Sequence, residues 1–251
     1  MNNAYDLVYV VREGEHNPDL LYSLRSVSKY CQFRNIWIAG HCPSWVTNVR
    51  VIPVPQGDSK YRNSTANLLA ACKTPEISDD FILMNDDFFA LRPIEDWEES
   101  LNKTQSTLIE HWIYLTKTQP TSPYRREFRN TYNFLREQGK PVANWELHIP
   151  FILNKRDFIL LCCMPEIIEY RQRHDIFMKR SIYKNYYPPK TQPTYMKDVK
   201  LLLNEDVSER FDNSDWLSVR DCMTDSDRET QYPKLHQLLT SKFNEPCPYE
   251  K

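Results

Sequence analysis

The chain carries two adjacent carboxylates at the point where a short apolar segment ends. Residues 81–89 read FILMNDDFF, so a four-residue apolar run delivers Asn85, Asp86 and Asp87 ahead of two aromatic residues. Carboxylates at the end of a buried strand are hard oxygen ligands, and a divalent cation held there can bind a phosphorylated ligand. The same residues also suit an Asx turn, in which the acids accept backbone hydrogen bonds. This segment by itself leaves both interpretations open.

A second pair of polar residues lies in NWELHIPFILN, which spans residues 144–154. Apolar residues alternate there with Glu146 and His148, a pattern that predicts a strand with both polar side chains on one face. A Glu-x-His pair on one face suits a metal ligand or an acid/base pair, and a structural histidine is the alternative. We expect a functional role for this pair.

Basic side chains gather in two runs that also contain aromatic residues. Residues 124–129 read YRREFR. In the segment 170–190, called the basic run below, Asp175 is the one acid, and the cations are Arg171, Arg173, Lys179, Arg180, Lys184 and Lys190. Such mixtures suit phosphates or polyanions, and a solvated helix face explains each run equally well. The net charge of 32 − 34 = −2 argues against a nucleic-acid binder that is basic over its whole surface.

The elements that must position these residues alternate between strand and helix over the first ninety residues. Asn17 and Ser59 suit the N-caps of two helices with one apolar face each. Apolar segments predict four strands, at residues 5–11, 36–39, 49–54 and 81–84. A repeated β-α-β order implies a parallel sheet with right-handed crossovers.

Glycines mark one edge of this predicted sheet. Gly14, Gly40 and Gly57 follow the first three strands, at the edge where open α/β sheets bind ligands. Asp86 and Asp87 follow the fourth strand, so they share that edge. Neither a GxGxxG fingerprint nor a GxxxxGK[ST] loop is present in the sequence. Any nucleotide must therefore be bound by another device.

Composition limits the class of protein. With 251 residues and 41% hydrophobic content, the chain can bury the core of one large domain. No apolar run approaches the roughly 20 residues that cross a bilayer, and no basic leader opens the sequence. Seven cysteines without a CxxC pair read as reduced core thiols. We expect a cytoplasmic protein without a membrane span.

Several segments resemble a known family. DLVYVVREGEHNPDLLYSLRSVSKY, IWIAG and FILMNDDFFAL resemble conserved blocks of the Stealth-type sugar-phosphate transferases, and they are closer still to small glycosyltransferase-like proteins of tailed bacteriophages. NWELHIPFILN, RSIYKNYY, MKDVK and PCPYE are also similar to the phage group. The resemblance covers most of the chain, and its specific part is the combination of LLYSLRSV with NDDFF.

The resemblance implies a single GT-A-like α/β domain with a mostly parallel, Rossmann-like sheet in its N-terminal half and a mixed α+β acceptor half. Residues 1–93 would bind the nucleotide sugar, and residues 94–251, with their clearest helix at 124–137, would bind the acceptor and close the site. A UDP-sugar donor and a Mn²⁺ or Mg²⁺ ion held by a DxD-like motif are also implied. That motif departs from D-x-D here, and the histidine-rich block of the full Stealth enzymes is missing.

Roles for individual residues follow from the resemblance and from their positions in the predicted sheet. Asp87 would hold the metal, and Asp86 would be a further ligand or bind sugar hydroxyls. His148 would be a late metal ligand, or Glu146 would be the base for the acceptor hydroxyl. The donor would be bound by Val11, Arg12, Lys60, Arg62 and Arg25. For Arg25, on the polar side of its helix, a structural ion pair is the favoured alternative, and the family pattern makes it a candidate.

Three functions are compatible with these features. The first is metal-dependent transfer of a sugar to a hydroxyl, with hydroxymethylated pyrimidines in phage DNA as one acceptor and the basic run on the DNA phosphates. The second is transfer of hexose-1-phosphate onto a polysaccharide, as in the Stealth enzymes. The third is a non-catalytic phage protein that binds nucleic acid or a host factor. The sequence specifies neither the sugar nor the oligomeric state.

Overall fold

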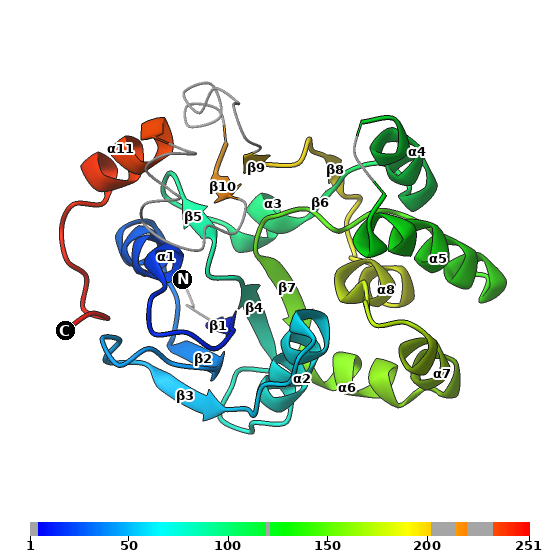
Figure 1. Cartoon of the computed structure of the whole chain (residues 1–251), viewed down its shortest axis with the longest axis horizontal. Helices are drawn as coiled ribbons and strands as arrows, with labels where there is room; N and C mark the ends of the chain where they lie inside the picture. The colour runs from blue at the N-terminus through cyan, green and yellow to red at the C-terminus, as the bar shows by residue number, and fades with distance from the viewer. Residues whose placement is uncertain (1–4, 119–120, 202–213, 220–232) are drawn as a thin grey trace.

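A five-stranded sheet forms the centre of the molecule (Figure 1). The computed structural model describes residues 5–118, 121–201, 214–219 and 233–251. The sheet has the order β3-β2-β1-β4-β7. Its strands are β1 (Asp6–Val11), β2 (Ile36–Gly40), β3 (Arg50–Pro53), β4 (Asp80–Met84) and β7 (Phe151–Asn154). The first four are parallel and β7 is antiparallel to β4, which confirms the predicted mostly parallel sheet.

Helices cover both faces of this sheet. Alternate residues of β1 point to opposite faces: Tyr9 packs in one apolar cluster with α1 (Pro18–Tyr30), and Val8 packs in another with α2 (Lys60–Cys72). The second cluster also contains residues of α6 (Lys155–Cys163) and α8 (Lys179–Tyr186). Burial on both faces explains why the parallel strands are almost continuously apolar.

The remaining elements extend the domain beyond the central sheet. A three-stranded sheet joins β5 (Phe88–Ala90), β10 (Trp216–Val219) and β9 (Lys200–Leu201), and β6 (Lys103–Thr104) pairs with β8 (Thr194–Tyr195). The other helices are α3 (Trp97–Leu101), α4 (Leu108–Thr118), α5 (Pro123–Glu137), α7 (Pro165–Arg173) and α11 (Pro233–Lys242). Helix α5 agrees with the helix predicted at 124–137. Since β7 joins the sheet of residues 1–93, the two halves share one sheet.

Local sequence signals set the beginnings of the first two helices as predicted. The Asn17 side chain accepts a hydrogen bond from the Leu20 N–H at 3.0 Å, and Ser59 caps α2 in the same way. Gly40 ends β2 with a φ of 114°, and a Cβ atom there would lie 2.1 Å from the carbonyl oxygen of Val11. Only glycine allows this close approach of β1 and β2.

Residues 144–150 do not form the predicted strand, because β7 begins only at residue 151. The Arg180 guanidinium donates to the carbonyl groups on either side of His148, so a side chain satisfies this backbone in place of a neighbouring strand. Glu146 and His148 therefore do not share a strand face. Their side chains bind different partners, the Ser181 N–H and the Asp198 carboxylate respectively.

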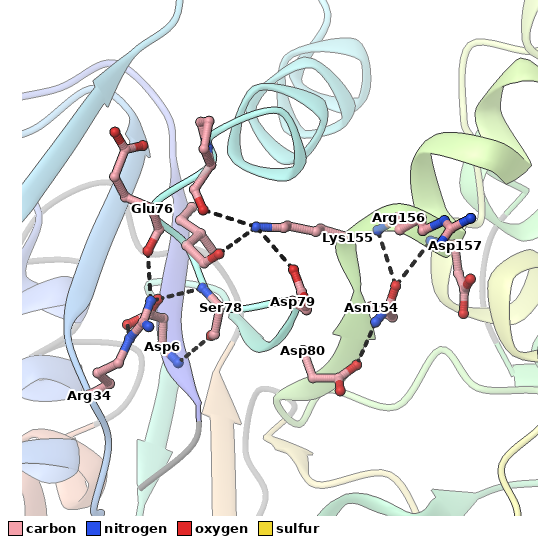
Figure 2. A network of polar contacts seen from close by, with 12 residues as sticks. Asp6, Arg34, Glu76, Ser78, Asp79, Asp80, Asn154, Lys155, Arg156 and Asp157 are labelled. Carbon is pink, nitrogen blue, oxygen red and sulfur yellow. Dashed lines mark hydrogen bonds and ion pairs between the residues drawn. The ribbon is translucent and has the colours of Figure 1, made fainter.

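The amino edge of the sheet, where the parallel strands begin, carries a network of polar contacts (Figure 2). The buried Asp6 carboxylate accepts hydrogen bonds from Arg34, Asn35 and the Ser78 N–H, at distances between 2.5 and 3.0 Å. At the end of β7, the Lys155 ammonium donates to the Ile77 carbonyl at 2.6 Å, and it also contacts Pro75 and Asp79. Acids, cations and backbone groups are matched along this edge.

Two further expectations concern membrane spans and the pairing of cysteines. Among the described helices, none combines the length and apolar character that crossing a membrane requires. The six cysteines in the described part of the chain are unpaired, and Cys222 lies outside the described residues.

Candidate active site

The carboxyl edge of the sheet gathers the acids that the sequence singled out. Asp86 and Asp87 form a turn between β4 and β5. Asp86 accepts a hydrogen bond from the Asn17 side chain at 2.8 Å, which ties it to the start of α1. Asp87 is 6% exposed and accepts from the Ser218 hydroxyl of β10 at 2.6 Å. Both carboxylates are thus oriented by neighbouring elements, at the edge where open α/β sheets bind ligands.

A buried guanidinium lies at the same edge. Arg180, in the first turn of α8, is 7% exposed and is stacked over the rings of Phe88 and Phe151. Its Nη1 group donates to the carbonyls of Leu147 and Ile149. No described carboxylate forms an ion pair with it. Burial lowers its pKa, against the opposing effect of neighbouring charges, chiefly Glu146, Tyr124 and Asp87.

His148 is fixed by one carboxylate through both its backbone and its ring. Asp198 accepts from the His148 N–H at 3.0 Å and pairs with its Nδ1 at 2.7 Å. These bonds hold the pKa of Asp198 well below its usual range although burial acts to raise it. A proton on Nδ1 directed at the carboxylate leaves the lone pair on Nε2. His111 of α4 interacts electrostatically with both of these residues. Burial lowers the pKa of His111, Asp198 acts to raise that pKa, and His148 acts to lower it.

Glu146 has a different position from the one expected. Its carboxylate accepts from the backbone N–H of Ser181 at 3.0 Å, in the first turn of α8. An acid beside a helix N-terminus satisfies an unbonded N–H group and interacts favourably with the helix dipole. Glu146 therefore helps to join the 144–150 segment to α8.

The beginning of α2 meets the beginning of α8. Lys179 is half-buried and donates to the Ser64 hydroxyl at 3.0 Å, and burial lowers its pKa to about 8. Arg62 forms an exposed ion pair with Asp175 at 2.5 Å. Lys60 is exposed at the first residue of α2, with its ammonium 5.3 Å from the Tyr61 ring. Cations from two segments distant in sequence, the start of α2 and the basic run, are therefore brought together.

The other three residues predicted to bind the donor are dispersed. The Val11 side chain is fully buried in the cluster with α1, so it is a core residue in this structure. Arg12 is exposed and lines a small cavity with Gly14, Asn17 and neighbouring residues, next to Asp86. The Arg25 guanidinium forms a bidentate pair with Glu250 at 2.8 and 2.6 Å, which is the structural ion pair given as its alternative.

A divalent cation fits part of this arrangement. In residues 5–118, 121–201, 214–219 and 233–251, no three His, Cys, Asp or Glu side chains form a metal-binding group, so His148 does not complete one with Asp86 and Asp87. Mg²⁺ is commonly bound by one or two carboxylates together with substrate phosphates. Asp86 and Asp87 could supply that protein share, with a diphosphate supplying further oxygens.

Sequence patterns missed two residues of this site. Asp198 precedes a short strand and has no patterned neighbour, so only the fold brings it 50 residues back to His148. Arg180 is named in the sequence only as one cation of the basic run, which suits phosphates or a solvated helix face, and helical spacing alone does not reveal that it faces inward. A signal was present: Ile182 and Tyr183 are buried, and so is Arg180 on the same short helix.

The sequence matches no protein-family model and no curated protein. Solved structures share its fold. The galactosyltransferase LgtC, in complex with donor and acceptor sugar analogs, aligns over 97% of this chain and 98% of its own, with 10% identity and a TM-score of 0.53. An active-site mutant of LgtC aligns over the same shares at 10% identity, with a TM-score of 0.51. The chain therefore has a GT-A-like α/β fold.

Proposed function

We propose that the protein transfers a sugar from a nucleotide-sugar donor to a hydroxyl acceptor at the carboxyl edge of its central sheet. The observation that carries this proposal is the buried Arg180 guanidinium, which no described carboxylate neutralises. Glycosyl transfer releases a nucleoside diphosphate, and negative charge grows on it in the transition state. A cation held in advance by two carbonyl groups and two rings can stabilise that charge without reorganisation.

The donor would lie between α1, α2 and α8. Arg180 would bind the diphosphate together with Lys179, whose lowered pKa reflects its burial beside α2. The exposed surface at Arg12, close to Asp86, would face the nucleoside. Asp86 and Asp87 would hold Mn²⁺ or Mg²⁺, which supplies Lewis-acid neutralisation of the leaving diphosphate when it is bound. UDP is the nucleotide that the family resemblance favours.

The acceptor hydroxyl requires a base, and His148 suits this role better than Glu146. Asp198 holds the Nδ1 proton of His148, so the lone pair of Nε2 can accept a proton from the acceptor. Glu146 already accepts a backbone hydrogen bond from Ser181. The pairing of an imidazole with a half-buried carboxylate also fixes the ring orientation. His148 is therefore our assigned base.

The fold supports this class of reaction. LgtC is a galactosyltransferase that was solved with donor and acceptor sugar analogs, and this chain aligns with nearly its whole length. At 10% identity the match supports the scaffold. The donor chemistry is argued from Arg180 and its neighbours.

DNA with hydroxymethylated pyrimidines stays a prediction for the acceptor. The basic run is not one solvent-facing stripe, because Arg180 is buried and Lys179 is tied to α2. Arg173 is exposed but pairs with Glu169. A band-shift titration at low salt, with and without hydroxymethylated pyrimidines, tests this acceptor, and a DNA contact through phosphates should weaken steeply with salt.

The proposed reaction is tested by incubating the protein with a panel of nucleotide sugars and Mn²⁺ or Mg²⁺. We expect release of a nucleoside diphosphate, which stops in chelator and returns with Mn²⁺. Release of nucleoside monophosphate would instead identify hexose-1-phosphate transfer. The absence of any turnover, together with no shift in melting temperature by any nucleotide sugar, would contradict the proposal and favour a non-catalytic binder.

A further inference from the structure

A second cavity lies beside α8, near the opposite end of that helix from Arg180. Its volume is about 200 Å³. The walls are formed by three segments: residues 141–145, the last turn of α8, and residues 188–193. Four prolines and Trp145 make much of this lining apolar, and the cationic residues in it are Lys184 and Lys190. The glycosyl-transfer proposal uses none of these residues.

The lining of this cavity includes donor groups that no described residue satisfies. Trp145 is 5% exposed, and its Nε1–H group has no hydrogen-bond partner among the described residues. The Asn185 amide is engaged by the protein, because it donates to the carbonyls of Ala143 and Ser181 and accepts from the Ala143 N–H. An indole N–H and ammonium groups can only donate. A ligand that satisfies them must present acceptors.

Lys184 gives the cavity an uncompensated charge. Its ammonium lies 5.1 Å from the Phe151 ring and 6.0 Å from the Trp145 ring, and it forms no ion pair or hydrogen bond with any described residue. Burial lowers its pKa, although Glu98 and Asp80 act in the opposite direction. Those two carboxylates are bonded to Tyr5 and Asn154 instead. A half-buried cation without a carboxylate partner is a binding group for an anion.

We infer that this cavity binds a sugar ring that carries a carboxylate, at a site separate from the donor site. A cavity of about 150 Å³ holds a benzene molecule, so the larger volume here suits one six-membered ring with a small substituent. The proline and indole surfaces match the apolar face of a sugar ring, and Lys184 with Trp145 matches the carboxylate.

The experiment compares two sugars that differ at one group. Binding of D-glucuronate and of D-glucose to the whole chain is measured by calorimetry and by ligand-observed NMR. We expect glucuronate to bind and glucose to bind at least tenfold more weakly, because one charge-assisted hydrogen bond is worth about 1.5–3 kcal/mol. Binding should weaken as salt is raised. Inorganic phosphate serves as a second anion, and tighter binding of phosphate than of glucuronate would overturn the sugar-acid assignment.

Variants locate the binding at this cavity. Lys184→Gln should lower the affinity for glucuronate about tenfold. Lys140→Gln is the matched control, because Lys140 also rests on an aromatic ring, 4.6 Å from Tyr186, but does not line the cavity. Trp145→Phe keeps a ring and removes the N–H donor, so it gives a second test with a several-fold expected loss. Equal effects of Lys184→Gln and Lys140→Gln would overturn the inference.

Competition separates this site from the donor site. A nucleoside diphosphate at saturating concentration should leave the binding of glucuronate unchanged. Displacement would mean that glucuronate occupies the donor site, and it would overturn the inference. Nucleotide-sugar turnover is recorded in the same preparations, so a failure of the proposed reaction would appear there while the glucuronate result stands on its own.

Discussion

The buried charged side chains at the two edges of the central sheet differ in their partners. At the amino edge, the fully buried Asp6 carboxylate is matched by the guanidinium of Arg34 and by further donors (Figure 2). At the carboxyl edge, the buried Arg180 guanidinium contacts only carbonyl oxygens and aromatic rings among the described residues. A buried charge costs free energy unless a partner compensates it. At the amino edge Asp6 has its ion-pair partner, whereas Arg180 forms no ion pair with any described carboxylate.

The pKa shifts follow the same contrast. Burial acts to raise the pKa of Asp6, but the hydrogen bond from Arg34 and those from Ser78 and Asn35 outweigh it, and the pKa lies below its ordinary value. For Arg180, burial outweighs the neighbouring carboxylates, and the pKa is lowered. The charged form is thus stabilised at the amino edge and left under-stabilised at the carboxyl edge. A bound diphosphate would reverse the situation of Arg180.

The largest effect that we predict is the loss of turnover in Arg180→Met. Methionine keeps an unbranched apolar stem among the rings and removes the cation. We expect kcat/KM for the nucleotide sugar to fall about 10³-fold, near 4 kcal/mol of transition-state stabilisation. Diphosphate release and the melting temperature are measured together. Arg180→Lys is the control: it keeps the charge but cannot donate to two carbonyls and a phosphate in one plane, so it should recover part of the activity.

Asp87→Asn should have the next largest effect. We expect turnover to fall a hundredfold or more, because an amide is a much weaker ligand for a divalent cation than a carboxylate. That loss corresponds to about 3 kcal/mol of transition-state stabilisation. Ser218→Ala removes the hydrogen bond to Asp87 but keeps the carboxylate, and it should cost far less. The readout is turnover as a function of Mn²⁺ concentration. Equal losses in both variants would show that Asp87 acts through β10 and not through a metal.

Asp6→Asn tests the opposite edge. We expect the free energy of unfolding to fall by about 3 kcal/mol, because the amide removes the negative charge that pairs with Arg34 and replaces one acceptor oxygen by an NH₂ group among donors, with turnover of the folded fraction unchanged. Since the folded pKa of Asp6 is lowered, its contribution is present above the ordinary pKa near 4 and is lost as the pH falls through the folded value. In denaturation of the wild type and the variant between pH 2 and 7, the difference in stability should therefore begin to shrink at about pH 4 and close as the pH falls further, through the folded pKa.

The sequence was sufficient to predict the elements of the central sheet and the first two helices. The strands, the two N-caps and the position of Asp86 and Asp87 depend on local spacing and on the alternation of elements, which the chain states directly. The helix at 124–137 also follows from its own periodicity. The GT-A-like fold came from the family resemblance, and the solved structures agree with it.

The site was only partly predictable, because its contacts are distant in sequence. The alternation in NWELHIP imitates a strand, yet that backbone is satisfied by Arg180 from another element. A structural ion pair is the favoured interpretation of Arg25, but its partner Glu250 lies 225 residues away and could not be named from the sequence. Charge runs give the number of cations but not which of them turn inward. Burial of a single arginine in a basic helix is decided by tertiary packing.

Asp198→Asn should reduce turnover by about 10- to 100-fold, the usual cost of losing a partner that orients a functional histidine. An asparagine side chain can still accept from the His148 N–H, so the fold should be kept. The ring nitrogens of His148, observed by ¹⁵N NMR, should change from one tautomer to a mixture. Unchanged ring signals together with unchanged kcat would contradict the assignment of His148 as a positioned base.

The smallest effect is expected for Arg62, and it decides how far the carboxyl edge extends. Its ion pair with Asp175 leaves both side chains about two-thirds exposed, at 66% and 69%, and exposed pairs contribute about 0.2–1 kcal/mol. If Arg62 only joins α2 to the start of α8, Arg62→Gln and Asp175→Asn should each lower stability within that range, and KM for the donor should stay within about twofold. The alternative is that Arg62 leaves Asp175 and binds the diphosphate, as its place at the start of α2 indicates. Arg62→Gln should then raise KM for the donor about tenfold, because one charge-assisted hydrogen bond is lost. Asp175→Asn should lower KM for the donor, because it frees the Arg62 cation. Opposite signs for the two variants would extend the donor site to α2, and equal small effects would confine it to Arg180, Lys179 and the acids after β4.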